Sequence, residues 1–319
     1  MRLRIPAKTF DNSEGQQSTF FSWILRDSAL FEKLCGEVGG KALITALHSY
    51  KGGTGKTLLS VNLAIIFAKM GKKVCLLDLD LRAPSIHSFF KIGSNYWVND
   101  YLSKACEIEK VLVDCTTRDM AKGKLFVGLA NPSTEAIREM TSKDRQWEME
   151  ALARLFSLKT SLLNDMRFDY VFFDTSPGLL YSSINAIVSA DVVLVVTSTD
   201  RSDVEGTQRM IHDLYELFKK KTGIIMNKVP LEPQENNTMK LETCGLPVVG
   251  VVPCSCDILD AEGKCLFASE KPNHPFTRKL QEIAANLVVI RGYSALPAPK
   301  PLKLRRCASD NAASFPHVR

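Results

Sequence analysis

A glycine-rich loop between an apolar strand and an amphipathic helix constrains this chain more than any other feature. The loop runs from Tyr50 to Thr57 (YKGGTGKT), after the apolar run 42–47 and before residues 58–70, which have helical spacing. Glycines let the backbone N–H groups of such a loop point toward one centre, where a Cβ would block the turn. The N-terminus of the following helix adds partial positive charge. This arrangement predicts a phosphate-binding loop, with Lys56 on the β- and γ-phosphates and Thr57 as a ligand of Mg²⁺.

The loop differs from an ordinary P-loop at its entrance. Tyr50 stands where the usual motif has its first glycine, and an additional lysine, Lys51, follows it. In this form, KGGTGKT, the loop resembles the deviant Walker A motif of the MinD/ParA family of ATPases. The resemblance implies that the loop binds ATP and that Lys51 reaches the nucleotide of a partner subunit. The loop residues expected to contact the nucleotide are Gly52, Gly53, Thr54, Gly55, Lys56 and Thr57.

Two further apolar strands end in acids, at the edge where a parallel α/β sheet carries its chemistry. One strand ends at Asp78 and Asp80, and a later one ends at Asp174, shortly before Gly178. The family resemblance makes residues 78–85 switch I and residues 174–178 switch II. It implies that Asp80 orients the attacking water and that Asp78 and Asp174 hold Mg²⁺ through its bound waters. It also implies that the N–H of Gly178 contacts the γ-phosphate.

Later strands supply the residues expected around the base. Asn227, in the strand at 223–228, occupies the place where the family recognises adenine. A GTPase of the Asn-Lys-x-Asp type would carry aspartate where this chain has Pro230, which favours ATP. Pro253 ends the last predicted strand, and the loop after it is expected to lie over the base.

Strands and helices alternate along the chain, which predicts an α/β fold with a mostly parallel, twisted sheet and helices on both faces. Apolar runs predict strands at 42–47, 74–77, 124–129, 168–173, 191–197, 223–228 and 246–253. Apolar spacing predicts helices at 58–70, 143–166, 205–221 and 276–290, with short helices near 87–90, 99–102 and 108–113.

Three segments are expected along the chain. The P-loop ATPase domain is placed at 41–292, after an N-terminal extension, 1–40, and before a tail, 293–319. The tail is rich in proline and basic residues, so it is expected to be disordered. Within the extension, 20–34 has roughly helical spacing and predicts either a helix docked on the core or a helix that binds a membrane surface or a partner.

Composition narrows the class of protein. No apolar run reaches the roughly 18 residues that a membrane span needs, and the nine dispersed cysteines are not a disulfide framework. A cytoplasmic protein, with peripheral membrane attachment left open, is the simplest interpretation. The net charge of +6 permits anionic partners without requiring them. The pair Cys254-x-Cys256 raises the question of a metal, although free cysteines more often serve as small apolar residues.

The family resemblance implies an Mg²⁺-dependent ATPase that works as a switch, with an ATP-bound homodimer and an ADP-bound monomer. An activating protein partner is expected to accelerate hydrolysis, and the output is expected to be spatial positioning on a membrane surface or on nucleic acid. One alternative is an Mrp-like carrier of Fe–S clusters or client proteins. A second is a bacterial-type tyrosine kinase, because residues 78–85 also match the Asp-x-Asp-x-Arg-x-Pro-Ser of those enzymes. Such kinases carry a C-terminal tyrosine cluster, whereas this tail has only Tyr293.

Overall fold

The computed structural model describes residues 43–216, 218–230, 238–240, 246–261, 265–292 and 303–305. The chain divides into two compact units, Met1–Gly39 and Gly40–Arg319, and all the described residues belong to the second. The predicted helix at 20–34 lies outside the described residues. No helix within the described ranges has the length and apolar character needed to cross a membrane.

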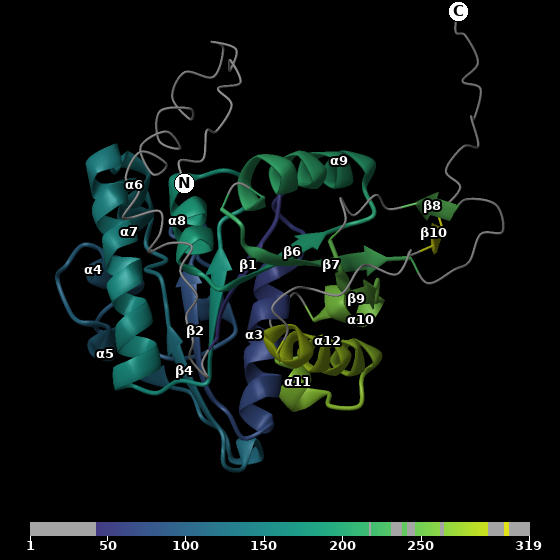
Figure 1. Ribbon diagram of the computed structural model, residues 1–319. Helices are drawn as coiled ribbons and strands as arrows, with labels where there is room; N and C mark the ends of the chain where they lie inside the picture. Colours follow the sequence, from purple (N-terminus) through teal and green to yellow (C-terminus); the bar gives the residue numbers. More distant parts are fainter. Residues whose placement is uncertain are drawn as a thin grey trace, which may run out of the picture. The chain divides into compact units, whose positions relative to one another are not determined.

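An eight-stranded sheet forms the centre of the second unit (Figure 1). The strand order is β3-β4-β2-β5-β1-β6-β7-β9, and every neighbouring pair is parallel except β3 with β4. The strands are β1 (Leu43–His48), β2 (Lys73–Leu79), β3 (Val113–Asp114), β4 (Lys124–Gly128), β5 (Tyr170–Thr175), β6 (Val192–Thr197), β7 (Lys221–Val229) and β9 (Val248–Pro253). A separate antiparallel pair joins β8 (Thr238–Lys240) to β10 (Lys303–Arg305).

Helices cover both faces of this sheet (Figure 1). On one face lie α3 (Lys56–Lys69), α11 (Phe267–Glu270) and α12 (Pro275–Gly292). On the other lie α7 (Arg145–Thr160), α8 (Tyr181–Ser189) and α9 (Arg201–Met210). The shorter helices are α4 (Val98–Leu102), α5 (Ile108–Val111), α6 (Thr134–Ser142) and α10 (Cys256–Asp260), with 3₁₀ turns at Ile86–Ser88 and Arg118–Met120. The predicted three-layer α/β architecture is confirmed.

Strand β5 illustrates why the apolar runs became central strands. All six of its residues are buried, because helices cover both faces of the sheet. Successive side chains point to opposite faces, so Tyr170 and Phe172 pack against Phe67 of α3, with ring centroids 4.2 and 5.5 Å away. Val171 and Phe173 join the hydrophobic cluster on the other face.

One expectation is wrong in detail. The predicted helix 205–221 is too long, because α9 and the π-helical turn after it (Ile211–Tyr215) end first and Lys221 already pairs with Val192 of β6. The apolar spacing continues past Tyr215, but residues from Lys221 onward form a strand because they pair with β6. Within the predicted tail 293–319 the structure describes only β10, a strand too short for periodicity to reveal. In addition, α6 and α8 were not predicted.

A buried carboxyl group packs between α7 and α8. Glu148 is 4% exposed, and its Oε2 accepts a hydrogen bond from Nδ2 of Asn185 at 3.1 Å. Burial raises the pKa of Glu148 from 4.5 to about 7, and the charge of Arg82 opposes this shift. Because the folded protein binds this proton more tightly than the unfolded chain, the contribution to stability is fully present below about pH 4.5 and is lost as the pH rises through about 7.

Replacing Glu148 by glutamine should therefore stabilise the protein at neutral and higher pH. The gain in the free energy of unfolding relative to wild type is expected to grow between about pH 5 and 8, up to ~3 kcal/mol. Urea unfolding at several pH values measures it. The control is Glu135→Gln on the exposed side of α6, which reports the effect of the same substitution at an exposed position. A Glu148→Gln difference that does not change with pH would contradict the raised pKa.

Candidate nucleotide-binding site

The glycine-rich loop connects β1 to α3 at the carboxyl edge of the sheet. Gly53 and Gly55 have φ angles of 73° and 95°, which glycine adopts at little cost. Gly55 directly precedes α3, and a Cβ there would lie 2.4 Å from Nδ2 of Asn227. That same nitrogen donates a hydrogen bond to the carbonyl of Thr54 at 2.7 Å. The side chain of Asn227 in β7 therefore fixes the shape of the loop, and its close approach leaves room only for glycine at position 55.

Lys56 is the first residue of α3, and its ammonium group points into the loop. The residue is 6% exposed, and Nζ donates a hydrogen bond to Oγ of Ser49 at 2.8 Å. Burial lowers the pKa of Lys56, while the nearby carboxyl of Asp174 opposes that shift. A buried cation at the end of a glycine-rich loop suits the binding of phosphate.

Thr57 contacts the acid of β5 and the segment that follows β2. Its Oγ1 donates a hydrogen bond to Oδ2 of Asp174 at 2.6 Å and lies 2.9 Å from Oγ of Ser85. The parallel register of β2 and β5 places Asp78 directly opposite Asp174. Asp78 accepts three backbone N–H groups from the loop that follows β2. Switch I, switch II and the P-loop are thereby joined by hydrogen bonds in one site.

These oxygen atoms fit a magnesium ion. Asp174 is 1% exposed and Asp78 is fully buried. Burial raises the pKa of Asp174 to about 7, and burial followed by repulsion from Asp174 raises the pKa of Asp78 well above its usual range. Among the described residues, Oδ1 of Asp174 is a buried oxygen without a hydrogen-bond donor. Carboxylate and hydroxyl oxygens are the ligands that Mg²⁺ prefers, and its charge would relieve this clustering of acids.

Switch II contacts both switch I and the loop. Oγ of Ser176 donates to Oδ1 of Asp80 at 2.7 Å, so the residue predicted to orient water is anchored by the neighbouring switch. Gly178 has a φ of 73°, and its N–H donates to the carbonyl of Ser49 at 2.8 Å. Gly52 lies against this segment, since a Cβ there would be 3.8 Å from Pro177. The predicted contact of Gly178 with γ-phosphate requires its bond to Ser49 to be exchanged.

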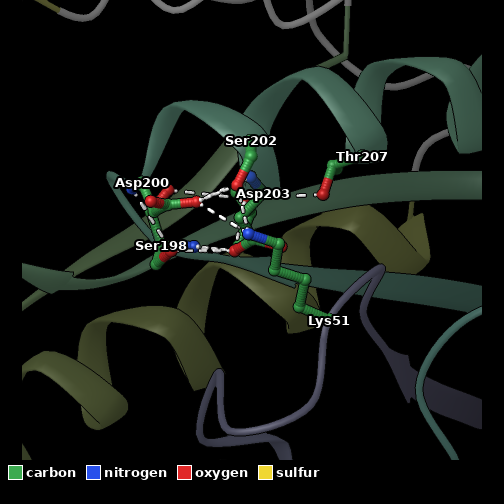
Figure 2. A network of polar contacts seen from close by, with 7 residues as sticks. Lys51, Ser198, Asp200, Ser202, Asp203 and Thr207 are labelled. Atoms are coloured by element: carbon green, nitrogen blue, oxygen red, sulfur yellow. Dashed lines mark hydrogen bonds and ion pairs between the residues drawn. The ribbon is translucent and has the colours of Figure 1, made fainter.

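Lys51 is folded back onto its own chain. Its Nζ lies 2.9 Å from Oδ1 of Asp200 and also donates to Oγ of Ser202, as Figure 2 shows. Asp200 caps the N-terminus of α9 by accepting the N–H of Asp203. The hydrogen bonds from Ser202 and then Lys51 hold the pKa of Asp200 well below its usual range. The side chains of Lys51 and Asp200 remain 41% and 60% exposed, so solvent and other molecules can reach this pair.

The residues expected around the base lie at the ends of β7 and β9. Val229 of β7 is paired with Pro253 of β9, and the N–H of Cys254 donates to the carbonyl of Val229 at 2.7 Å. Lys228 donates from Nζ to the carbonyl of Gly53 at 2.7 Å. Asn227 braces the loop through its amide nitrogen, as described above. The structure thus brings the predicted base residues to the same edge as the phosphate loop.

Some contacts in the site were not anticipated from the sequence. Ser49 accepts hydrogen bonds from Lys56 and from the N–H of Gly178, and it belongs to no motif. Lys228, considered only in the comparison with the Asn-Lys-x-Asp sequence of GTPases, donates to the carbonyl of Gly53. Their position at the carboxyl ends of predicted strands was the only available signal. Cys254 and Cys256, which raised the question of a metal, are exposed thiols. In the part of the chain that the structure describes, no group of three or more His, Cys, Asp or Glu side chains is arranged to hold a metal ion.

The parallel sheet, the glycine loop after its central strand β1 and the lysine, threonine and aspartates gathered there define a class of protein. The chain is a P-loop nucleotide-binding α/β protein. Comparison with known proteins then identifies the family. A family model described as an AAA domain matches residues 42–228, and the chain belongs to the MinD/ParA-type P-loop ATPases.

Relatives and solved structures agree with this assignment. The chain is 29% identical over 251 residues to an uncharacterized ATP-binding protein of Methanocaldococcus jannaschii, covering 77% of this chain and 88% of that protein. It is 27% identical over 241 residues to the septum site-determining protein MinD of Synechocystis, covering 73% and 84%. The structure of MinD from Pyrococcus horikoshii complexed with Mg-ADP has the same fold, with a TM-score of 0.63 at 21% identity, covering 79% of this chain and 98% of that one.

Proposed function

We propose that this protein is an Mg²⁺-dependent ATPase whose nucleotide state switches it between a dimer and a monomer. The observation that carries the proposal is the convergence of Lys56, Thr57 and Asp174 at one edge of the sheet, with Lys51 exposed beside them. The first three residues suit the binding of phosphate and metal within one subunit. The fourth lies where a second subunit can reach it.

Within one subunit, the chain's own residues bind and orient ATP. Lys56 and the loop N–H groups neutralise the phosphates, and Thr57, Asp174 and Asp78 would hold the metal. Bound Mg²⁺ would supply positive charge on the β- and γ-phosphate oxygens. Asp80, whose Oδ1 accepts a hydrogen bond from Ser176, would orient the attacking water.

A second subunit would complete the site through Lys51. We infer that Lys51 leaves Asp200 and Ser202 when two ATP-bound copies meet, and that its ammonium group then contacts the nucleotide of the partner. A cation placed against the transferred phosphoryl group stabilises the charge of the transition state, as an arginine finger does. Until then the exposed ion pair with Asp200 holds Lys51 at the surface. Such pairs are weak, so Lys51 can leave Asp200 at little cost.

The output that best suits this switch is spatial positioning within the cell. MinD relatives among the comparisons bear the name septum site-determining protein, and an ATP-dependent dimer offers a surface that exists in only one nucleotide state. We propose that the dimer acts at a membrane surface or on nucleic acid, and that a protein partner accelerates hydrolysis.

The oligomeric state of Asp80→Ala tests the switch. Loss of the carboxylate that orients water should stop hydrolysis and leave ATP bound, so light scattering coupled to gel filtration should show a dimer with ATP and a monomer with ADP. The control is Asp165→Ala, an exposed carboxylate at the opposite edge of the sheet, before β5, which should hydrolyse ATP like wild type. A variant that binds ATP and stays monomeric, or that is dimeric with either nucleotide, would refute the proposed switch.

A further inference from the structure

A buried histidine joins the strand before the P-loop to switch II. His48 is the last residue of β1 and is fully buried. Its Nε2 lies 2.8 Å from the carbonyl oxygen of Gly178, and its Nδ1 lies 2.5 Å from the hydroxyl of Tyr215. The rings of His48 and Tyr215 meet edge to face, with centroids 6.1 Å apart. The imidazole therefore bridges two segments that are far apart in the sequence.

The two hydrogen-bond partners of His48 determine which ring nitrogen carries the hydrogen. A carbonyl oxygen can only accept, so Nε2 carries the hydrogen and donates it to Gly178. Nδ1 is then an acceptor, and the hydroxyl of Tyr215 donates to it. Burial lowers the pKa of His48 to about 3, with a further lowering from the charge of Lys56, so the ring is neutral at physiological pH. The result is a directional chain of hydrogen bonds from Tyr215 through His48 to Gly178.

This chain fixes the peptide groups on both sides of Gly178. The carbonyl oxygen of Gly178 accepts from His48, and its N–H donates to the carbonyl of Ser49, the next residue along. Gly178 is at a φ of 73°, a conformation that other residues rarely adopt. Because its N–H is the group expected to contact γ-phosphate, its resting position is set by two consecutive residues that precede the P-loop.

The other end of the chain of hydrogen bonds lies on the helix that stores Lys51. Tyr215 ends the π-helical turn that continues α9, and π-turns often occur at functional sites. The N-terminus of α9 holds Lys51 through Asp200. Between them, the ring of Tyr50 packs on the same helix, since a Cβ on Gly206 would lie 2.0 Å from Tyr50 Cε1. Helix α9 and its π-turn therefore contact three residues at the loop entrance, His48, Tyr50 and Lys51, at both ends and in the middle.

We propose that His48 is a positioning residue that holds switch II at Gly178 and couples it, through Tyr215, to α9 and the storage of Lys51. The role in hydrolysis rests on the proposed ATPase function, whereas the positioning of Gly178 does not. Movement of Gly178 toward a nucleotide would pull on His48 and Tyr215 and thereby on the helix that carries the partner of Lys51.

Tyr215→Phe tests the coupling with the smallest change, because it keeps the ring and removes only the hydroxyl. The expected result is a fall in kcat of about tenfold, with KM for ATP unchanged within about twofold. The matched control is Tyr101→Phe, which removes another buried hydroxyl, one that donates to the carbonyl of Arg154 at 2.9 Å, away from the loop. Both variants should lose similar thermal stability, and only Tyr215→Phe should lose turnover.

A second pair of variants separates positioning from packing. His48→Gln can still donate an N–H toward the carbonyl of Gly178, whereas His48→Leu cannot, so kcat should be higher for His48→Gln than for His48→Leu. Equal values for the two, or a Tyr215→Phe enzyme that matches Tyr101→Phe in kcat and KM, would overturn the positioning role.

Hydrogen exchange distinguishes this inference from the proposed function. In nucleotide-free protein, the hydrogen bond from the N–H of Gly178 to Ser49 protects this N–H from exchange. Loss of the Tyr215 hydroxyl should let Gly178 move and open this bond more often, so the peptide containing Gly178 should exchange faster in Tyr215→Phe than in wild type or Tyr101→Phe. This readout needs no hydrolysis. If the wild-type protein fails to hydrolyse ATP while Gly178 shows this faster exchange, the proposed function fails and the positioning stands. If wild type is active and exchange at Gly178 does not change, the positioning is wrong.

Discussion

Replacing Lys56 by alanine is expected to remove nucleotide binding, with a loss of affinity for ATP of at least ~100-fold. Lys56 is 6% exposed at the start of α3, and its Nζ donates a hydrogen bond at 2.8 Å to Oγ of Ser49, the residue just before the loop. A charge-assisted bond from an ammonium group to phosphate is among the stronger interactions in a protein. The backbone N–H groups and the helix dipole that remain cannot replace it. Isothermal titration with ATP and Mg²⁺ measures the loss.

The matched control for this variant lies on the same helix. Lys69 is at the other end of α3 and forms an ion pair with Asp119 at 2.7 Å. Lys69→Ala should bind ATP like wild type, which shows that truncating a paired lysine of α3 is not by itself harmful. Circular dichroism confirms that both variants are folded. ATP affinity in Lys56→Ala within about threefold of wild type would mean that the loop is not the phosphate site.

Replacing Lys51 by alanine is expected to separate binding from turnover. ATP affinity should stay within about twofold of wild type, because Lys51 points away from its own loop and toward Asp200. Turnover should fall at least ~100-fold, since a cation supplied in trans to a phosphoryl transfer is typically worth ~10³ or more in kcat. Loss of the exposed pair should leave thermal stability nearly unchanged. Steady-state ATPase assays and ATP titrations at matched protein concentration measure both quantities.

Two companion variants sharpen this result. Lys104 forms a similarly exposed ion pair with Glu150 at 2.6 Å, away from the loop, and Lys104→Ala should keep wild-type turnover. Asp200→Asn weakens the contact that holds Lys51 but keeps the positive charge of Lys51, so turnover should be retained. Unchanged turnover in Lys51→Ala would show that Lys51 has no part in catalysis. A loss of turnover in Asp200→Asn equal to that of Lys51→Ala would show that the pair itself, and not its release, is required.

Much of the candidate site could be predicted because its parts are local in sequence. An apolar run, a glycine turn and a helix predicted the phosphate loop, and strands ending in Asp78 and Asp174, read with the family resemblance, predicted acids that hold the metal. Parallel strands end at one edge of a sheet, so these residues had to lie near each other once the fold class was known. The structure adds the register that sets Asp78 opposite Asp174 and the bond from Thr57 to Asp174.

Other features could not be predicted because they depend on distant pairing. Helical spacing ran on through residues 205–221, and only the hydrogen bonds between β6 and β7 end the helix and turn Lys221 into a strand residue. In the same way, no local pattern connects His48 with Tyr215 across 167 positions of the chain. A single histidine at the end of an apolar run forms no sequence pattern, so its role can be inferred only from its contacts in the folded protein.

The class of fold was therefore predicted from the chain itself, and so were the positions of the glycine loop and of the acids at the strand ends, since glycine turns, strand periodicity and terminal acids are properties of consecutive residues. The storage of Lys51 on Asp200, the brace from Asn227 to Thr54 and the bridge through His48 were decided by the tertiary structure. Each of these contacts joins residues more than a hundred positions apart. They form only after strand order and register have brought those residues together, and no short-range rule encodes that order.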